Sequence, residues 1–137
     1  MRLLASREHS RFELRNKLLR RGYSTDEVEQ ALDSLVADGL QSDERYAEQY
    51  VELRRAKGYG PLRVRAELRE RGVADGLIDL IVDEHDPVWY ETLRRVHDKK
   101  YGAVAPASMK ERAARSRFLG YRGFSGGQVR RLLGEED

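Results

Sequence analysis

A glycine-centred repeat of about 50 residues constrains this chain more than any other feature of its sequence. Arg21-Gly22-Tyr23, Arg71-Gly72-Val73 and Arg122-Gly123-Phe124 recur at spacings of 50 and then 51 residues. In every copy a leucine lies four residues before the glycine, and apolar residues follow it at offsets of 6, 9 and 10. Those three offsets place the following apolar side chains on one face of a helix. The chain is therefore predicted to contain three structural repeats, the last of them short.

Helix start and stop signals agree with this repeat. Four segments match the capping box, in which a serine and a Glu or Gln three residues later bond each other's backbone N–H groups. They are Ser10–Glu13, Ser24–Glu27, Ser108–Glu111 and Ser125–Gln128. Prolines follow Gly60 and Asp86, at the first helical position, where a missing N–H costs nothing. The predicted helices span 11–21, 25–38, 43–57, 61–71, 75–85, 87–100, 109–122 and 126–133, after a helical stub over 1–9.

The fold class follows from these helices. No segment shows the period-two alternation of a strand, so the chain is predicted to be all-α. Helices this short are unstable alone in water, and neighbouring repeats must cover one another's apolar faces. We expect tandem three-helix repeats that form an elongated, curved stack, with repeats at 1–58, 59–102 and 103–137. Residues 102–107 are the one segment expected to act as a flexible joint.

Charge also follows the repeat. The chain has 26 Lys and Arg residues against 24 Asp and Glu, a net charge of only +2. Resolved along the sequence, the net charges are +5 for 1–25, −8 for 26–52, +5 for 53–73, −6 for 74–93, +9 for 94–131 and −3 for 132–137. The first helix after each repeat boundary is thus basic, and in the first two repeats the next helix is acidic.

Two interpretations of the basic helices remain open. Opposite blocks could neutralise each other within a repeat, or the basic faces could bind a polyanion or an acidic protein. Arg11 with Arg15, and Arg65 with Arg69, place like charges one helical turn apart, which costs a little helix stability. Arginine also outnumbers lysine, which suits bidentate contacts with phosphate or carboxylate.

Catalysis has little support in the sequence. The absence of cysteine excludes disulfides, thiol catalysis and cysteine-based metal sites. His9, His85 and His97 show no metal-ligand spacing, and Ser125-Gly126-Gly127 lacks the lysine of a phosphate-binding loop. We assign no active site, no cofactor and no metal. No apolar run approaches the roughly 20 residues of a membrane span. We expect a soluble, cytoplasmic protein without a signal peptide.

Several strings are specific enough to compare with known families. They are Arg7–Ser10 with Glu13-Leu14, Arg45–Glu48, Lys57–Leu68, Lys100–Gly102 and Arg117–Phe124. Together they resemble the RecX family, bacterial regulators of the RecA recombinase, over nearly the whole chain. The first repeat begins at the start of the sequence, so we expect no counterpart of an N-terminal extension found in relatives.

The resemblance implies a partner and a mode of action. Family members consist of tandem three-helix repeats and bind the RecA filament on single-stranded DNA along its groove. The resemblance further implies inhibition of strand exchange, ATP hydrolysis and co-protease activity, and thus a role in DNA repair, recombination and the SOS response. Direct DNA binding also occurs in the family. No catalytic residues are carried over, because the family is not defined by any.

Ten basic residues are predicted to contact the filament or DNA. They are Arg11, Arg15, Arg54, Arg55, Lys57, Arg63, Arg65, Arg69, Arg115 and Arg117. The other interpretation is a general DNA-binding helical module that affects recombination indirectly. No membrane partner is expected, and the oligomeric state is left open.

Overall fold

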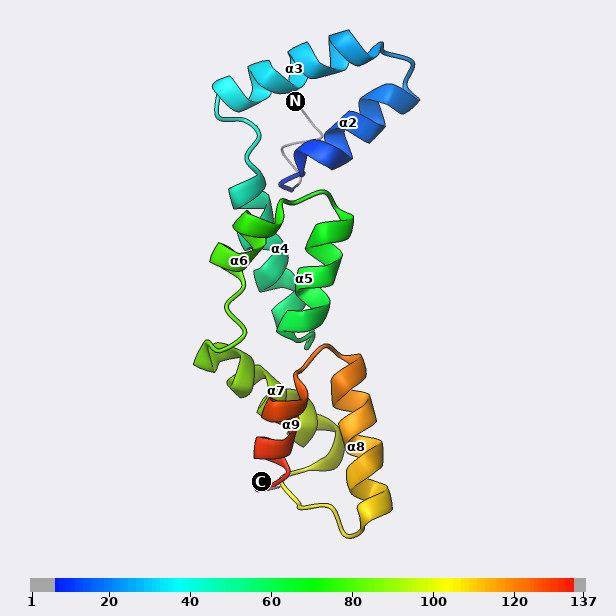
Figure 1. Cartoon of the computed structure of the whole chain (residues 1–137), viewed down its shortest axis with the longest axis vertical. Coiled ribbons are helices and arrows are strands. Elements are labelled where there is room, and N and C mark those ends of the chain that lie inside the picture. Colours follow the sequence, from blue (N-terminus) through cyan, green and yellow to red (C-terminus); the bar gives the residue numbers. More distant parts are fainter. Residues whose placement is uncertain (1–6, 135–137) are drawn as a thin grey trace. The chain divides into compact units, whose positions relative to one another are not determined.

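The structure, a computed structural model, describes residues 7–134, and within this range every regular element is an α-helix (Figure 1). The all-α prediction is confirmed. The helices are α2 (Arg11–Arg20), α3 (Thr25–Ala37), α4 (Asp43–Ala56), α5 (Pro61–Glu70), α6 (Asp75–Ile81), α7 (Pro87–Tyr101), α8 (Met109–Tyr121) and α9 (Gly126–Leu132). Each begins at its predicted residue, and all but α6 end within one residue of the predicted end. The elongated, curved form of the stack stays a prediction.

The helix ends use the capping residues expected of them. Ser10 and Ser24 each form a complete capping box, with the serine side chain accepting from the backbone N–H three residues later. The Asp86 carboxylate accepts from the Val88 N–H ahead of α7, which has proline in its first turn. These bonds satisfy N–H groups that have no partner inside the helix.

One predicted helix is wrong at its end. Helix α6 ends at Ile81 instead of continuing to residue 85. There the Asp83 carboxylate accepts from the His85 N–H at 3.0 Å, a local bond that competes with the helical ladder. Of the helical stub predicted over 1–9, residues 7–9 lie outside any helix, and residues 1–6 are outside the described part of the chain.

The chain divides into two compact units whose boundary passes through α4 and α5. In the described range, unit 1 consists of residues 7–50 and 67–81, and unit 2 of residues 51–66 and 82–134. A hydrophobic core in unit 1 joins α2 to α3 through Leu14, Val28, Leu32 and Leu35. The two helices of the first predicted repeat therefore cover each other's apolar faces.

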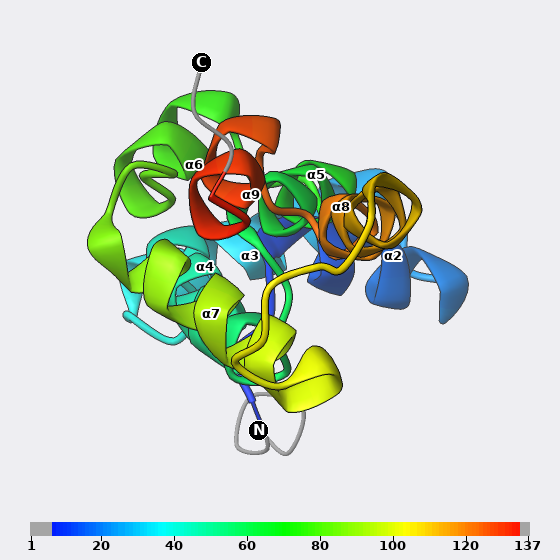
Figure 2. The ribbon, with the colours of Figure 1, turned by 90° about the horizontal axis from the view of Figure 1, so that it is seen from below.

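Unit 2 has a second core, at the packing of α7, α8 and α9. Its fully or nearly fully buried members are Leu93, Val96, Leu119, Phe124, Val129 and Leu133. The segment 102–108, yellow in Figure 2, joins α7 to α8 beside this core. Leu119 and Val129 are two of the four apolar positions that the glycine repeat marked in its third copy, and both are buried.

A close contact between two glycines fixes the packing within unit 2. The Gly60 N–H donates to the Arg122 carbonyl at 2.8 Å, and the Leu62 N–H donates to the Gly123 carbonyl at 3.0 Å. Gly123 has a φ of +105°, and a Cβ added to Gly60 would lie 2.5 Å from the Gly123 carbonyl carbon. The start of α5 thus rests directly on the turn after α8, with no space for a side chain between them.

The same contact occurs in unit 1 at the repeat-equivalent positions. There the Ser10 hydroxyl donates to the Arg71 carbonyl at 2.9 Å. The following residue, Gly72, has a φ of +80°, and a Cβ placed on it would lie 2.3 Å from Cβ of Phe12. In both units, therefore, a helix start meets the glycine turn that follows a helix of the next repeat. We call this contact the glycine junction.

The junction predicts opposite effects for two glycines of unit 2. Gly60→Ala should lower the free energy of unfolding by roughly 1–3 kcal/mol, because its Cβ has no room beside Gly123. Gly120→Ala is the matched control, since it lies inside α8 with nothing within 4 Å of an added Cβ. That change should raise stability by up to about 1 kcal/mol. Urea unfolding measures both, and equal effects of the two substitutions would contradict the junction.

Candidate functional site

The ten basic residues predicted for partner binding are distributed over both units. Arg11, Arg15 and Arg69 belong to unit 1, and Arg54, Arg55, Lys57, Arg63, Arg65, Arg115 and Arg117 belong to unit 2.

In unit 1, Arg11 and Arg15 on α2 share one acidic partner on α3. Arg11 Nη2 lies 2.9 Å from Glu29 Oε2, and Arg15 Nε lies 2.7 Å from Glu29 Oε1. Arg11 Nη2 also lies 2.8 Å from Asp33 Oδ1. The basic helix and the acidic helix of this repeat thus neutralise each other, as one of the two interpretations of the charge blocks expects. The shared carboxylate offsets the repulsion between the two arginines.

The shared carboxylate has a strongly shifted pKa. Hydrogen bonds first from Arg15 and then from Arg11 lower the pKa of Glu29 from 4.5 to about 2. A carboxyl group whose pKa is lowered on folding stabilises the folded state above its unfolded pKa. That contribution is lost as the pH falls from about 4.5 toward 2.

Substitution of Arg15 should move this titration. In Arg15→Gln we expect the pKa of Glu29 to rise from about 2 toward 4.5, because its largest stabilising hydrogen bond is gone. Carboxyl chemical shifts followed by NMR measure the pKa. Arg20→Gln, which removes an equal charge from the exposed end of α2, should leave Glu29 near 2. A pKa that stays near 2 in Arg15→Gln as well would disprove the shared ion pair.

Three further predicted residues also bond within their own unit. Arg69 Nε lies 2.9 Å from Asp75 Oδ1 in unit 1, and both side chains are more than half exposed. In unit 2, Arg55 Nη2 lies 2.7 Å from Glu52 Oε2, and Arg65 donates to the Val82 carbonyl at 3.1 Å. Solvent screens the exposed Arg69–Asp75 pair, so a partner's anion can replace Asp75 at little cost.

Arg115 is a correction to the predicted set. Only 3% of its surface is exposed. Its Nη1 approaches His97 Nε2 at 3.0 Å and donates to the Val104 carbonyl at 2.6 Å, while Nη2 pairs with Glu111. These bonds hold the segment expected to be a joint against α8. The sequence spacing indicates this burial, because Arg115 lies one helical turn before Leu119, which is buried on the same face of α8. Arg115 is therefore a core residue and not a surface contact.

Arg115 and its exposed neighbour Arg117 should differ in their effect on stability. Arg115→Ala leaves the buried His97 nitrogen and the Val104 carbonyl without a donor, which should cost roughly 2–4 kcal/mol of unfolding free energy. Arg117→Ala removes the same charge from an exposed position of α8 and should change stability by less than about 0.5 kcal/mol. Thermal unfolding compares them, and an equal cost would show that the buried bonds contribute nothing.

Arginines surround the ring of Tyr59 in unit 2. The guanidinium carbons of Arg54, Arg63 and Arg122 lie 3.9, 4.5 and 5.0 Å from the ring centroid. Such cation–π contacts hold positive charge over an aromatic face. Arg54 and Arg63 belong to the set of predicted contact residues. Arg122 was not in that set, and only the structure places it at this ring.

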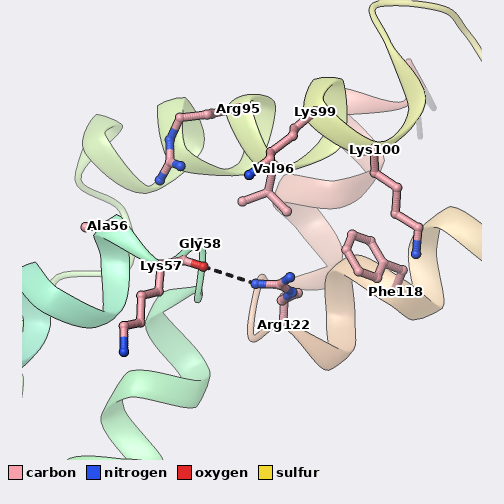
Figure 3. Close-up of a pocket in the computed structure, with 9 residues that line it drawn as sticks. All are labelled: Ala56, Lys57, Gly58, Arg95, Val96, Lys99, Lys100, Phe118 and Arg122. Carbon is pink, nitrogen blue, oxygen red and sulfur yellow. Dashed lines mark hydrogen bonds between the residues drawn. The ribbon is translucent and has the colours of Figure 1, made fainter.

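Next to this ring, unit 2 has a basic cavity of about 520 Å³ (Figure 3). The end of α4, the second half of α7 and the last turns of α8 surround it. Its lining residues are Ala56, Lys57, Gly58, Arg95, Val96, Lys99, Lys100, Phe118 and Arg122. Five of these nine are cations and none is acidic. We call this the basic cavity.

Of its five cations, the predicted set contained only Lys57. The other four lie in or near the +9 block, which indicates the region but not the residues. One signal was available, since Arg95 and Lys99 are four residues apart and so share a face of α7. No sequence pattern connects α7 to the end of α4.

The chain is similar to known proteins along its whole length. Family models of the RecX three-helix domains match three successive segments: the first domain at 1–35, the second at 42–80 and the third at 89–133. The chain belongs to the RecX family. A regulatory protein RecX of Pseudomonas fluorescens is 47% identical over 97% of this chain and 86% of its own length. One from Halorhodospira halophila is 42% identical over 100% and 85%.

Solved RecX structures have the same fold. A crystal structure of a regulatory protein RecX aligns with a TM-score of 0.81 at 23% identity, covering 98% of this chain and 67% of that one. RecX from Lactobacillus salivarius aligns with a TM-score of 0.82 at 20% identity, covering 98% and 89%. Tandem three-helix domains are thereby established for this RecX family member.

The RecX domains group the helices differently from the predicted repeats. The second and third domains combine α4–α5–α6 and α7–α8–α9, so each begins with the helix before the repeat's basic helix. The predicted boundaries at 58/59 and 102/103 place that helix at the end of the previous repeat. The period of about 50 residues is the same in both descriptions.

The described residues form neither a metal site nor a membrane span. Over residues 7–134, no three His, Asp or Glu side chains come together in a group that could hold a metal ion. Within the same range no helix has the length and hydropathy needed to cross a membrane.

Proposed function

We propose that this chain regulates the RecA recombinase by binding the RecA filament on single-stranded DNA along its groove. Binding there inhibits ATP hydrolysis, strand exchange and co-protease activity, and so modulates DNA repair, recombination and the SOS response in the cytoplasm. The observation that carries the proposal is similarity at 42–47% identity, over nearly the whole chain, to proteins named regulatory protein RecX.

The surface of the molecule is consistent with this proposal. Lys57, Arg69 and Arg117 are exposed, and Arg69 has only a solvent-screened internal partner. A filament presents the same surface many times, so several weak contacts made by successive repeats would add up to strong binding without one deep pocket. Arg11 and Arg15 contribute less in this scheme, because Glu29 already neutralises them.

Binding to coated and bare DNA tests the proposal. At equal salt, the chain should bind single-stranded DNA covered by RecA more tightly than the same strand without RecA. It should also inhibit RecA's DNA-dependent ATPase. A general DNA-binding module would bind the bare strand equally well or better, with a steep loss of affinity as salt rises. Fluorescence anisotropy with one labelled oligonucleotide measures binding to the coated strand and to the bare strand.

A pair of variants at Arg69 connects the effect to one cation. Arg69→Gln removes the charge, and we expect the concentration for half-maximal ATPase inhibition to rise about three- to tenfold, as for loss of one charged contact. Asp75→Asn breaks the same internal ion pair but keeps the cation, so inhibition should be retained or improved. Equal loss in both variants would assign the effect to the ion pair itself and remove Arg69 from the contact surface.

A further inference from the structure

The basic cavity of unit 2 concentrates positive charge without acidic partners. In the described part of the chain, no carboxylate lies within ion-pair distance of Lys57, Arg95, Lys99, Lys100 or Arg122. Unit 1 shows the opposite arrangement, where Glu29 lies between Arg11 and Arg15. Five like charges around one cavity repel each other, and an anion that enters it relieves this repulsion.

Two of these cations are held in place by backbone carbonyls. Arg95 on α7 donates to the Arg55 carbonyl at 3.0 Å. Arg122 donates to the Lys57 carbonyl at 3.2 Å (Figure 3). Both carbonyls belong to the end of α4. Each guanidinium has five N–H donors, so one such bond leaves others for a ligand while it fixes the direction of the group. The site is thus organised before any anion arrives.

The apolar part of the cavity limits what the ligand can be. Lys100 Nζ lies 3.8 Å from the ring centroid of Phe118, and the Arg122 guanidinium carbon lies 5.4 Å from it. The ring therefore holds cations at the cavity and is not a free surface on which a base could stack. Recognition by charge alone, independent of base sequence, is what this arrangement favours.

We propose that the basic cavity binds linked phosphoryl groups. A single carboxylate would balance one of five cations, whereas successive phosphates carry several negative charges and accept the fork-shaped bonds of arginine. Linked phosphates come from two sources, the backbone of a single-stranded nucleic acid and a free triphosphate. This proposal does not depend on the proposed function, because the cavity would bind phosphates in the isolated protein, without RecA.

The test measures binding to the isolated protein. The probes are a labelled oligo-dT strand and inorganic triphosphate. In the double variant Lys57→Gln/Lys99→Gln, the affinity for oligo-dT should fall at least tenfold. The slope of log affinity against log salt should shrink by about 1.4, as for two lost phosphate contacts on a single strand. Both lysines are exposed, and circular dichroism checks that helicity is unchanged.

A charge-matched control separates the cavity from general basicity. Lys110→Gln/Arg130→Gln removes two exposed cations of unit 2 that lie outside the cavity, and it should weaken binding less than about twofold. An equal loss in both double variants would overturn the site, since binding would then follow net charge alone. So would an affinity for both probes that does not depend on Lys57 and Lys99.

Competition then distinguishes the two sources. If triphosphate displaces oligo-dT, the cavity accepts free phosphate chains as well as a strand, and the proposal holds for both. If oligo-dT binding depends on the cavity but triphosphate does not displace it, the strand backbone is the ligand. Inhibition of RecA can fail in its own assay while either result stands, so the two proposals are tested separately.

Discussion

The glycine junction is the contact on which the rest of this structure depends. Between residues 7 and 134 none of the helices is long enough to be stable alone, so each needs a neighbour at a defined position. The junction supplies it by bringing a helix start against the glycine turn at Gly72 or Gly123, close enough that no side chain fits between them. Short hydrogen bonds to the Arg71 and Arg122 carbonyls then fix the register. The apolar cores of the two units pack around contacts that the backbone has already positioned.

The electrostatics of the two units differ in a way that the net charge of +2 conceals. In unit 1 the basic α2 lies beside the acidic α3, and their charges pair. In unit 2 basic residues of α7 and α8 line the basic cavity at the end of α4, and the carboxylates Glu111 and Asp98 are bonded to Arg115 and His97. Positive charge therefore accumulates at the basic cavity, and one chain combines a self-neutralised surface with one that is open to anions.

Much of the fold could be predicted from the sequence, because helix starts and stops are local. Ser10, Ser24 and Pro87 act within one turn of their own position, and they marked helix starts correctly. The basic cavity could not be predicted, because it forms only when α4, α7 and α8 meet. Arg115 is intermediate: it occupies the position of the buried Leu14 and Val64 in the other repeats. This equivalence was a signal for burial that the predicted set of contact residues did not use, because the charge of Arg115 favoured the surface.

The hydroxyl of Ser10 has a consequence for how unit 1 opens. It accepts from the Glu13 N–H inside α2 and donates its single hydrogen to the Arg71 carbonyl after α5. When the Ser10 side chain moves away, both bonds break together. Fraying of the first turn of α2 and loosening of the turn at Gly72 are therefore one cooperative event. Amide protons in these two segments, far apart in the chain, should consequently exchange with solvent at linked rates. In unit 2 the backbone N–H of Gly60 replaces the hydroxyl, and this coupling passes through the main chain alone.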